Sequence, residues 1–307
     1  MSHKSKLTLR QQANLKMNEI FVAGQSKHAA KTAARDEYDA LVSSGKDVSF
    51  TKKEYVEQAL REKIFSYKTY EAYKKHQNYF LDWCKEKYRS KTLSACRSHV
   101  DEWLMEREQQ GLSAYTLKLE SAALAKLYSE PTTNFYKTKE RKRSEIKRSR
   151  GTAARDYGFS LSNNKEIIDF ERATGLRRSE LTNLKGNQLV IQDDQPFLKI
   201  KGKGGRVRLS PIIGEHKDEV VAKCLAAGDN KVWQRVPSHM DVHSYRSEYA
   251  TAIYFAKERS LDELPPSEKY YCKGDMQGKV FDRKALKAAS EALGHSRINV
   301  VAEHYVR

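Results

Sequence analysis

Apolar residues recur at intervals of three and four along most of the chain, which is the pattern of amphipathic helices. The strongest pattern begins at Ser66 and contains three such stretches of about 15–20 residues joined by short turns. Gly111 followed by Ser113 marks the end of one helix and the N-cap of the next, and Pro131 ends the third. The pattern predicts a compact three-helix bundle.

Residues 8 to 64 carry shorter helical patterns. One apolar stripe begins at Ala13 and ends near Gly24, a typical C-terminal cap. Thr51 and Glu54 have the spacing of a capping box, which predicts the start of another helix. This extension shows no chemistry of its own. We expect either an arm that contacts DNA or protein, or an added part of the bundle.

The periodicity changes in the C-terminal half, where short apolar runs alternate with turn residues. The runs are 189–191, 197–200 and 207–209, and helical patterns precede and follow them. They predict a small antiparallel sheet of three strands. The fold class is therefore mainly helical, with a small antiparallel sheet in the C-terminal domain.

A basic stretch separates the two halves. Between Lys137 and Arg155 there are nine Lys or Arg and two Glu, without apolar periodicity, which is typical of a linker. The predicted organisation is a helical N-terminal extension, a helical domain, a basic linker and a C-terminal domain, over 1–64, 65–130, 131–155 and 156–307.

The net charge of the chain indicates which class of partner it binds. The 307 residues include 57 Lys plus Arg and 40 Asp plus Glu, a formal net charge of +17. Such an excess favours a polyanionic partner, and nucleic acid is the leading candidate. The four cysteines have no metal-ligand spacing, which fits reduced thiols in a cytoplasm. No apolar run has the length of a membrane span, and no signal peptide is recognisable, so we expect no membrane partner.

Four segments of the C-terminal half carry candidate chemistry. They are Ala173-Thr-Gly-Leu-Arg-Arg-Ser-Glu-Leu181, Lys201-Gly-Lys-Gly-Gly-Arg-Val-Arg208, His243-Ser-Tyr-Arg246, and Leu293-Gly-His-Ser296 followed by Tyr305. Arginine grips phosphate oxygens through two parallel hydrogen bonds. Residues three apart on a helix, such as His243 and Arg246, project from one face. A lysine between glycines at a hairpin tip can reach a phosphate or a leaving oxygen.

This ordered set resembles the tyrosine recombinases, the integrase family of phages and mobile elements. The resemblance covers most of the chain and implies a helical core-binding domain followed by an α+β catalytic domain. It implies catalytic roles for Arg177, Glu180, Lys203, His243, Arg246, His295 and Tyr305. Lys201 competes with Lys203 for the role of the hairpin lysine.

The reaction implied is attack by Tyr305 on a DNA phosphodiester, which leaves a 3′-phosphotyrosyl bond and a free 5′-hydroxyl. The arginines and a histidine would stabilise charge at phosphorus, and Lys203 would protonate the leaving oxygen. The covalent intermediate conserves the bond energy, so we expect neither ATP nor a metal cofactor.

The implied function is a site-specific recombinase that exchanges strands of two double-stranded DNA sites through a Holliday junction. It would act as a homo-tetramer in the bacterial cytoplasm on the nucleoid, with accessory DNA-bending or directionality proteins. The candidate DNA-binding residues are Lys74, Lys75, Arg141, Lys142, Arg143 and Arg206. Two alternatives stay open: a nicking-closing enzyme like a type IB topoisomerase, and a DNA-binding accessory protein without catalysis.

Overall fold

The structure is a computed structural model that describes residues 7–142, 145, 158–202 and 205–306. The chain divides into two compact units, residues 1–146 and 147–307. Each unit has hydrophobic clusters of its own. Within the described residues, no helix has both the length and the apolar character that crossing a membrane requires.

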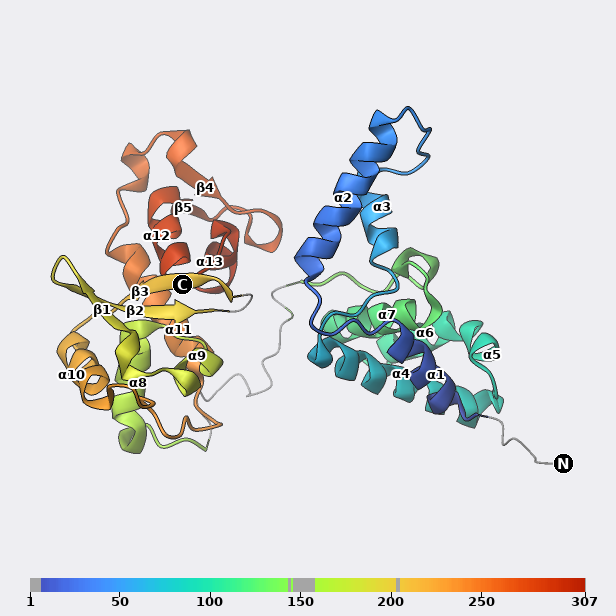
Figure 1. The fold of residues 1–307 in the computed structure, drawn as a ribbon, viewed down its shortest axis with the longest axis horizontal. Coiled ribbons are helices and arrows are strands. Elements are labelled where there is room, and N and C mark those ends of the chain that lie inside the picture. The colour runs from blue at the N-terminus through green and yellow to red at the C-terminus, as the bar shows by residue number, and fades with distance from the viewer. Residues whose placement is uncertain (1–6, 143–144, 146–157, 203–204, 307) are drawn as a thin grey trace. The chain divides into compact units, whose positions relative to one another are not determined.

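The first unit is built from helices (Figure 1). They are α1 (Leu9–Glu19), α2 (Lys27–Ser43), α3 (Lys52–Ala59), α4 (Tyr67–Tyr88), α5 (Leu93–Arg97), α6 (Val100–Gln109), α7 (Ala114–Tyr128) and a short 3₁₀ turn (Thr132–Asn134). Thr51 and Glu54 form the predicted capping box of α3. The hydroxyls of Ser66 and Ser113 accept from the backbone of the first turns of α4 and α7.

Helices α4, α6 and α7 form the bundle, whose core contains Phe80, Trp103 and Leu124. The middle stretch of the pattern is two helices instead of one, because α5 ends at its C-cap Ser98 and α6 begins after His99. The apolar spacing continues across this break, so periodicity alone does not reveal it.

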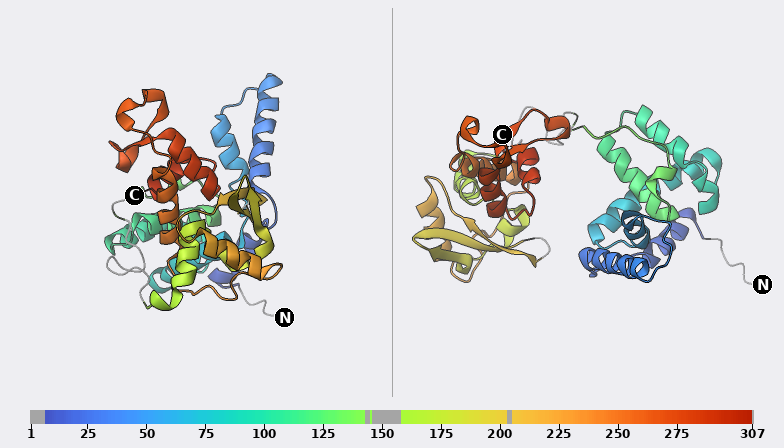
Figure 2. Two further views of the ribbon diagram at one scale, coloured as in Figure 1. Left: turned by 90° about the vertical axis from the view of Figure 1, so that its left-hand side faces the viewer. Right: turned by 90° about the horizontal axis from the view of Figure 1, so that it is seen from above.

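The N-terminal extension consists of two different parts. Helix α1 belongs to the bundle, since Leu9 and Ala13 pack in the same cluster as Phe80. Helices α2 and α3 form a hairpin that projects from the bundle (Figures 1 and 2) around a small core of their own. Lys126 of α7 holds the base of this hairpin, because its ammonium donates to the carbonyls of Leu60, Arg61 and Lys63 at 2.7, 2.6 and 3.1 Å.

The beginning of the predicted linker packs on the first unit. Phe135 is buried in the bundle core, and Thr138 is also buried. The Tyr136 hydroxyl donates to Glu108 at 2.8 Å. Residues 146–157, the greater part of the remaining linker, lie outside the described residues.

The second unit combines helices with two small sheets. Its elements are α8 (Lys165–Thr174), α9 (Arg178–Asn183), β1 (Leu189–Gln192), β2 (Gln195–Lys201), β3 (Val207–Pro211), α10 (Lys217–Ala227), α11 (Val242–Phe255), β4 (Lys269–Tyr271), β5 (Val280–Asp282), α12 (Arg283–Leu293) and α13 (Ile298–His304). The fold class predicted from the sequence is confirmed. Helix α10 and the β4–β5 pair were not predicted.

The main sheet has the order β1-β2-β3 and is antiparallel throughout. Asp193 and Asp194 connect β1 to β2, both with positive φ (48° and 59°), which suits the right-handed twist of a two-residue hairpin. The tip between β2 and β3 includes residues 203–204, which are not among the described residues.

Helix α11 lies against both α8 and α12, and α13 packs on α12. Two buried clusters result, one beside the main sheet and one between α11, α12 and α13. Gly175 ends α8 with φ of +57°, and a Cβ there would lie 2.2 Å from the ring of Tyr249. Only glycine fits this position, at which the chain leaves α8 and continues to Arg177 and α9.

Candidate active site

Tyr305 follows α13, and its ring is buried among other predicted residues. The ring centroid lies 5.1 Å from that of His243 and 5.3 Å from that of His295. The guanidinium carbon of Arg246 lies 5.6 Å from the same ring. Helix α11 and the turn that follows α12 therefore meet at the predicted nucleophile.

The two arginines of the predicted set converge on one carbonyl. Arg246 is 1% exposed and donates to the carbonyls of Gly175 and Leu293, the latter at 2.6 Å. Arg177 also donates to the Leu293 carbonyl, at 3.4 Å, and its side chain is 30% exposed. Burial, and after it the charge of Arg177, lowers the pKa of Arg246, whereas Tyr305 raises it. Two cations this close favour an anion between them.

The Glu180 carboxylate holds both the backbone and the guanidinium group of Arg177. The carboxylate accepts from the Arg177 backbone N–H and from Nη1, both at 2.8 Å. Arg208 of β3, which was not among the predicted site residues, donates to both carboxylate oxygens at 3.0 and 2.8 Å. Burial favours the neutral acid, but the hydrogen bonds and charge of Arg208 and Arg177 outweigh it and lower the Glu180 pKa to about 2.

His295 is placed by the end of α12. Its backbone N–H donates to the Ser290 carbonyl at 2.8 Å, and the Ser290 hydroxyl donates to the His295 carbonyl at 3.1 Å. Its Nε2 and the Nε of Arg246 are both buried and have no hydrogen-bond partner among the described residues. Buried polar atoms are rarely left unpaired in this way, so the pair has capacity for a ligand.

We expect His295 to be neutral in the free protein. Burial, followed by the charges of Arg246, Arg177 and Arg208, lowers its pKa to about 4. In an NMR titration, the imidazole signal that His295→Gln removes should stay constant from pH 8 down to about pH 5 and move only below that. Inorganic phosphate bound between the arginines should shift this midpoint upward. A midpoint near 6.5 in the free protein would contradict this description of the site.

Helix α11 also holds the backbone of Tyr305. The hydroxyls of Ser247 and Thr251 both donate to the Tyr305 carbonyl, the second at 3.2 Å. Ser247 directly follows Arg246 on the same helix, and Thr251 lies about one and a half turns beyond Arg246. One helix therefore positions His243, Arg246 and the main chain of the predicted nucleophile.

Glu171 of α8 is a second carboxyl that sequence reasoning missed. It is fully buried, and neither oxygen has a hydrogen-bond partner within the described part of the chain. Burial raises its pKa well above the ordinary value, although Arg246 opposes this. Burial therefore favours the neutral form of this carboxyl, against the charge of Arg246.

Glu171→Gln should therefore change how stability depends on pH. A carboxyl whose pKa is raised on folding stabilises the fold below about pH 4.5, and this contribution is lost as pH rises towards the folded-state value. The Tm of Glu171→Gln relative to the unsubstituted protein should increase between pH 5 and pH 8. Calorimetry at both pH values checks this, with the exposed Glu291→Gln as control. A Tm difference that does not change with pH would contradict the neutral carboxyl.

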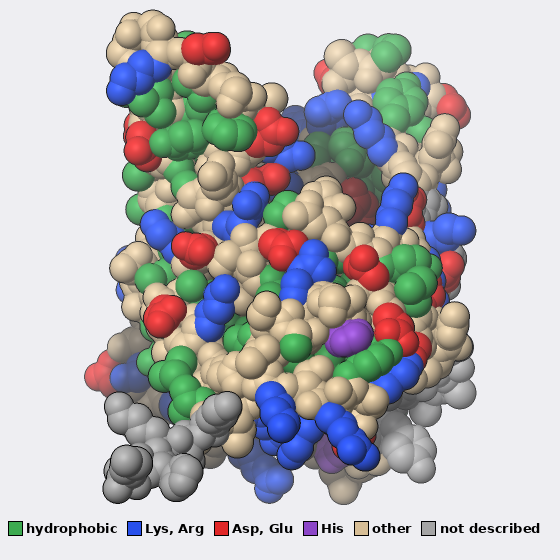
Figure 3. All heavy atoms as spheres, turned by 90° about the vertical axis from the view of Figure 1, so that its right-hand side faces the viewer, with side chains coloured by type: hydrophobic (Ala, Val, Ile, Leu, Met, Phe, Trp, Pro, Cys, Tyr) green, Lys and Arg blue, Asp and Glu red, His purple; other side chains and the backbone are tan. Residues whose placement is uncertain are grey.

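Several predicted residues cannot be placed in the site. Lys203 and Arg143 lie outside the described residues, whereas Lys201 and Arg206 are exposed on either side of the hairpin tip. Of the other DNA-binding candidates, Lys75 and Arg141 are exposed next to the rings of Tyr79 and Tyr115, Lys74 is half-buried, and Lys142 is exposed. On the face in Figure 3, basic side chains alternate with acidic and apolar ones, so this view does not identify a DNA-binding surface.

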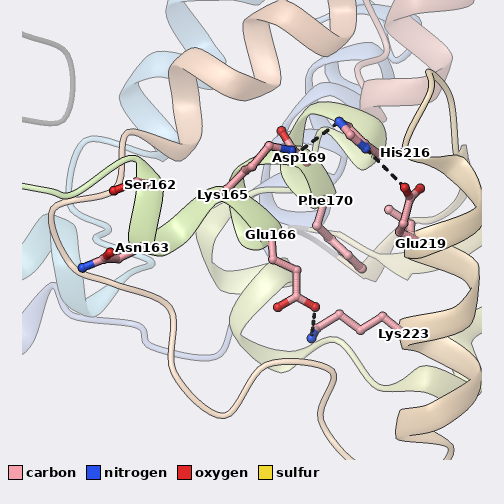
Figure 4. Close-up of a pocket in the computed structure, with 10 residues that line it drawn as sticks. Ser162, Asn163, Lys165, Glu166, Asp169, Phe170, His216, Glu219 and Lys223 are labelled. Carbon is pink, nitrogen blue, oxygen red and sulfur yellow. Dashed lines mark hydrogen bonds and ion pairs between the residues drawn. The ribbon is translucent and has the colours of Figure 1, made fainter.

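A separate cavity of about 450 Å³ lies between α8 and α10 (Figure 4). Its charged side chains pair with one another. Lys223 binds Glu166 at 2.5 Å, and His216 lies 3.5 Å from Asp169 and 3.6 Å from Glu219. None of the predicted site residues lines this cavity.

Comparison with known proteins shows a family domain in the first unit and a shared fold. Residues 53–132 match the family model described as phage integrase, N-terminal SAM-like domain. Two structures of the XerH site-specific recombinase are similar across 97% of this chain. The post-cleavage complex with palindromic difH substrate has 17% identity, 90% coverage of that chain and a TM-score of 0.50, and the pre-cleavage complex has 16%, 91% and 0.49. The Tn1549 transposon integrase (aa 82–397) with circular intermediate DNA has 12% identity, covers 76% of this chain and 89% of that one, and has a TM-score of 0.42.

No curated protein matches the chain. The resemblance to the tyrosine recombinases is nevertheless confirmed: the chain has their fold and carries the SAM-like domain of phage integrases.

Proposed function

We propose that this protein is a site-specific DNA recombinase of the integrase type, which cleaves and rejoins DNA through a covalent bond to Tyr305. The observation that carries the proposal is the position of the Tyr305 ring, with centroids 5.1 and 5.3 Å from those of His243 and His295 and with Arg246 at 5.6 Å. A phenol surrounded by imidazoles and guanidinium groups suits nucleophilic attack on an anionic phosphorus centre.

In the proposed step the phenol oxygen of Tyr305 attacks the scissile phosphorus and loses its proton, while the bond from phosphorus to O5′ breaks. Arg177 and Arg246 would hold the non-bridging oxygens, because both guanidinium groups already point at the Leu293 carbonyl. A neutral His295 has one N–H donor and one acceptor nitrogen, so it can bind a phosphate oxygen or take up the phenol proton. Lys203 is the proposed source of the proton for O5′.

The new 3′-phosphotyrosyl bond conserves the energy of the broken phosphodiester bond, so a 5′-hydroxyl can reverse the step. Attack by the hydroxyl of a second duplex would exchange strands, and a homo-tetramer on two DNA sites would produce and resolve a Holliday junction. DNA would be bound by residues that include Lys74, Lys75, Arg141, Lys142, Arg143 and Arg206. The net charge of +17 implies that affinity falls steeply with salt.

The test is covalent trapping in EDTA. Nicked duplexes tiled across the DNA that flanks the protein's own gene are incubated with the protein and separated on SDS gels. We expect an SDS-resistant adduct on at least one duplex, and recombinant products when two intact sites are supplied. Relaxation of supercoiled plasmid without recombinants would indicate a topoisomerase-like enzyme. Tight binding without any adduct would overturn the proposal in favour of an accessory protein.

A further inference from the structure

Arg208 connects three segments of the candidate site: the one that carries Arg177 and Glu180, the base of the β2–β3 hairpin, and the turn that precedes His295. It lies on β3 opposite Ile200 of β2, and its side chain is 6% exposed. Its fork donates to Glu180, which binds Arg177, and its Nε donates to the Ala292 carbonyl at 3.0 Å, three residues before His295. All three nitrogens of the guanidinium group are therefore used inside the protein.

The main chain approaches the Arg208 side chain closely at two glycines, Gly294 and Gly202. A Cβ on Gly294 would lie 2.6 Å from Cδ of Arg208, so the turn that precedes His295 is packed directly on it. A Cβ on Gly202 would lie 3.4 Å from Nη1 of Arg208. Gly202 is the residue before Lys203, at the base of the β2–β3 hairpin.

We propose that Arg208 is a positioning residue that sets Arg177, His295 and the hairpin base relative to one another. It would act through Glu180 and the end of α12 without contact to DNA or to the reacting atoms. A lysine could not replace it, because a single ammonium cannot span a carboxylate and a separate carbonyl as a planar fork does. The part that concerns catalysis rests on the proposed recombinase function.

The catalytic arm of the test measures the rate of adduct formation at saturating DNA. Misplacement of about 1 Å costs on the order of 10²-fold in rate, so Arg208→Lys should slow adduct formation by about this factor while DNA affinity changes little. Arg208→Met provides a second variant of similar length. If Arg208 acts through Glu180, adding Glu180→Gln to Arg208→Lys should slow the reaction far less than the product of the two single effects.

The structural arm needs no activity. Hydrogen exchange followed by mass spectrometry should show faster exchange in Arg208→Lys at three places together: residues 176–183, 200–202 and 290–297. Arg172→Lys is the matched control, since Arg172 pairs with Glu248 and Asp169 on the surface of the same unit. It should change neither exchange in these segments nor the rate.

The two arms separate the possible failures. An adduct rate within about threefold of the unsubstituted protein, or faster exchange confined to β3, would overturn the role of Arg208. If the unsubstituted protein forms no adduct on any DNA, the recombinase proposal fails, and the exchange data alone then decide whether Arg208 orders the three segments.

Discussion

Tyr305→Phe is expected to abolish covalent attachment to DNA, with a fall in rate of about 10³-fold or more. The substitution removes the attacking oxygen, and no other group of the proposed site replaces it. The ring contacts with His243, His295 and Arg246 do not need the hydroxyl, and the backbone carbonyl of Tyr305 keeps its hydrogen bonds to α11. The variant should therefore fold and bind DNA like the unsubstituted protein. Adduct formation on SDS gels and binding by fluorescence anisotropy measure the two properties side by side.

Tyr271→Phe is the matched control for this experiment. Tyr271 is half-exposed at the end of β4 in the same unit, and its hydroxyl is not part of the site. It should form adduct at the normal rate. Attachment that persists in Tyr305→Phe, or disappears in Tyr271→Phe, would show that the nucleophile is wrongly assigned.

Arg246→Ala should reduce the rate of adduct formation by about 10²–10³-fold, the usual effect of removing a donor that stabilises charge in a transition state. The buried guanidinium also supplies donors to the Gly175 and Leu293 carbonyls. An unpaired buried carbonyl costs about 1–3 kcal/mol, so the Tm should fall as well. Loss of one phosphate contact should lower the slope of log K against log salt by roughly 1. Cleavage kinetics, calorimetry and a salt series test these effects.

Arg172→Ala separates the role of Arg246 from a general loss of positive charge. The Arg172 guanidinium lies 5.3 Å from the ring of Tyr245 and pairs with Asp169 and Glu248, and its side chain is 47% exposed. Its substitution should leave cleavage within about threefold of normal. Equal losses in both variants would mean that Arg246 contributes only charge.

The candidate site was predicted from the resemblance to the tyrosine recombinases, whose motifs lie at recognisable positions of this sequence: a glycine-ended turn, a hairpin tip, a helix face or a cap. Arg208 carries no such mark. It lies two positions after Arg206, which directly precedes β3, and residues two apart in an extended strand share a face, yet Arg206 is exposed and Arg208 is buried. Nothing local shows whether a basic residue of this strand faces solvent or turns inward to Glu180; that depends on where α9 and α12 pack.

Glu171 and Ser247 were missed for a related reason. Each is a polar residue on a helix whose pattern indicates partial burial, and polar residues of such helices are usually exposed to solvent. Their significance follows from tertiary contacts, with the neighbouring arginines in the first case and with the Tyr305 carbonyl in the second. The spacing of apolar residues does not predict a contact between α11 and Tyr305.

The fold was predictable where an apolar stripe and a cap coincided, as in α3, α4 and α7. It was not predictable for α2, a largely exposed helix with Ala34 as its buried residue. The stability of such a helix depends on its partner α3 and on the attachment of that partner to Lys126. These contacts are absent from any local pattern.

The proposed function requires that Tyr305 becomes joined to a DNA 3′ end. The most direct measurement is mass spectrometry of the adduct trapped on a nicked duplex, after digestion of both the protein and the DNA. We expect a nucleotide linked through its 3′-phosphate to the peptide that contains Tyr305. A linkage to any other residue, or attachment through a 5′-phosphate, would contradict it.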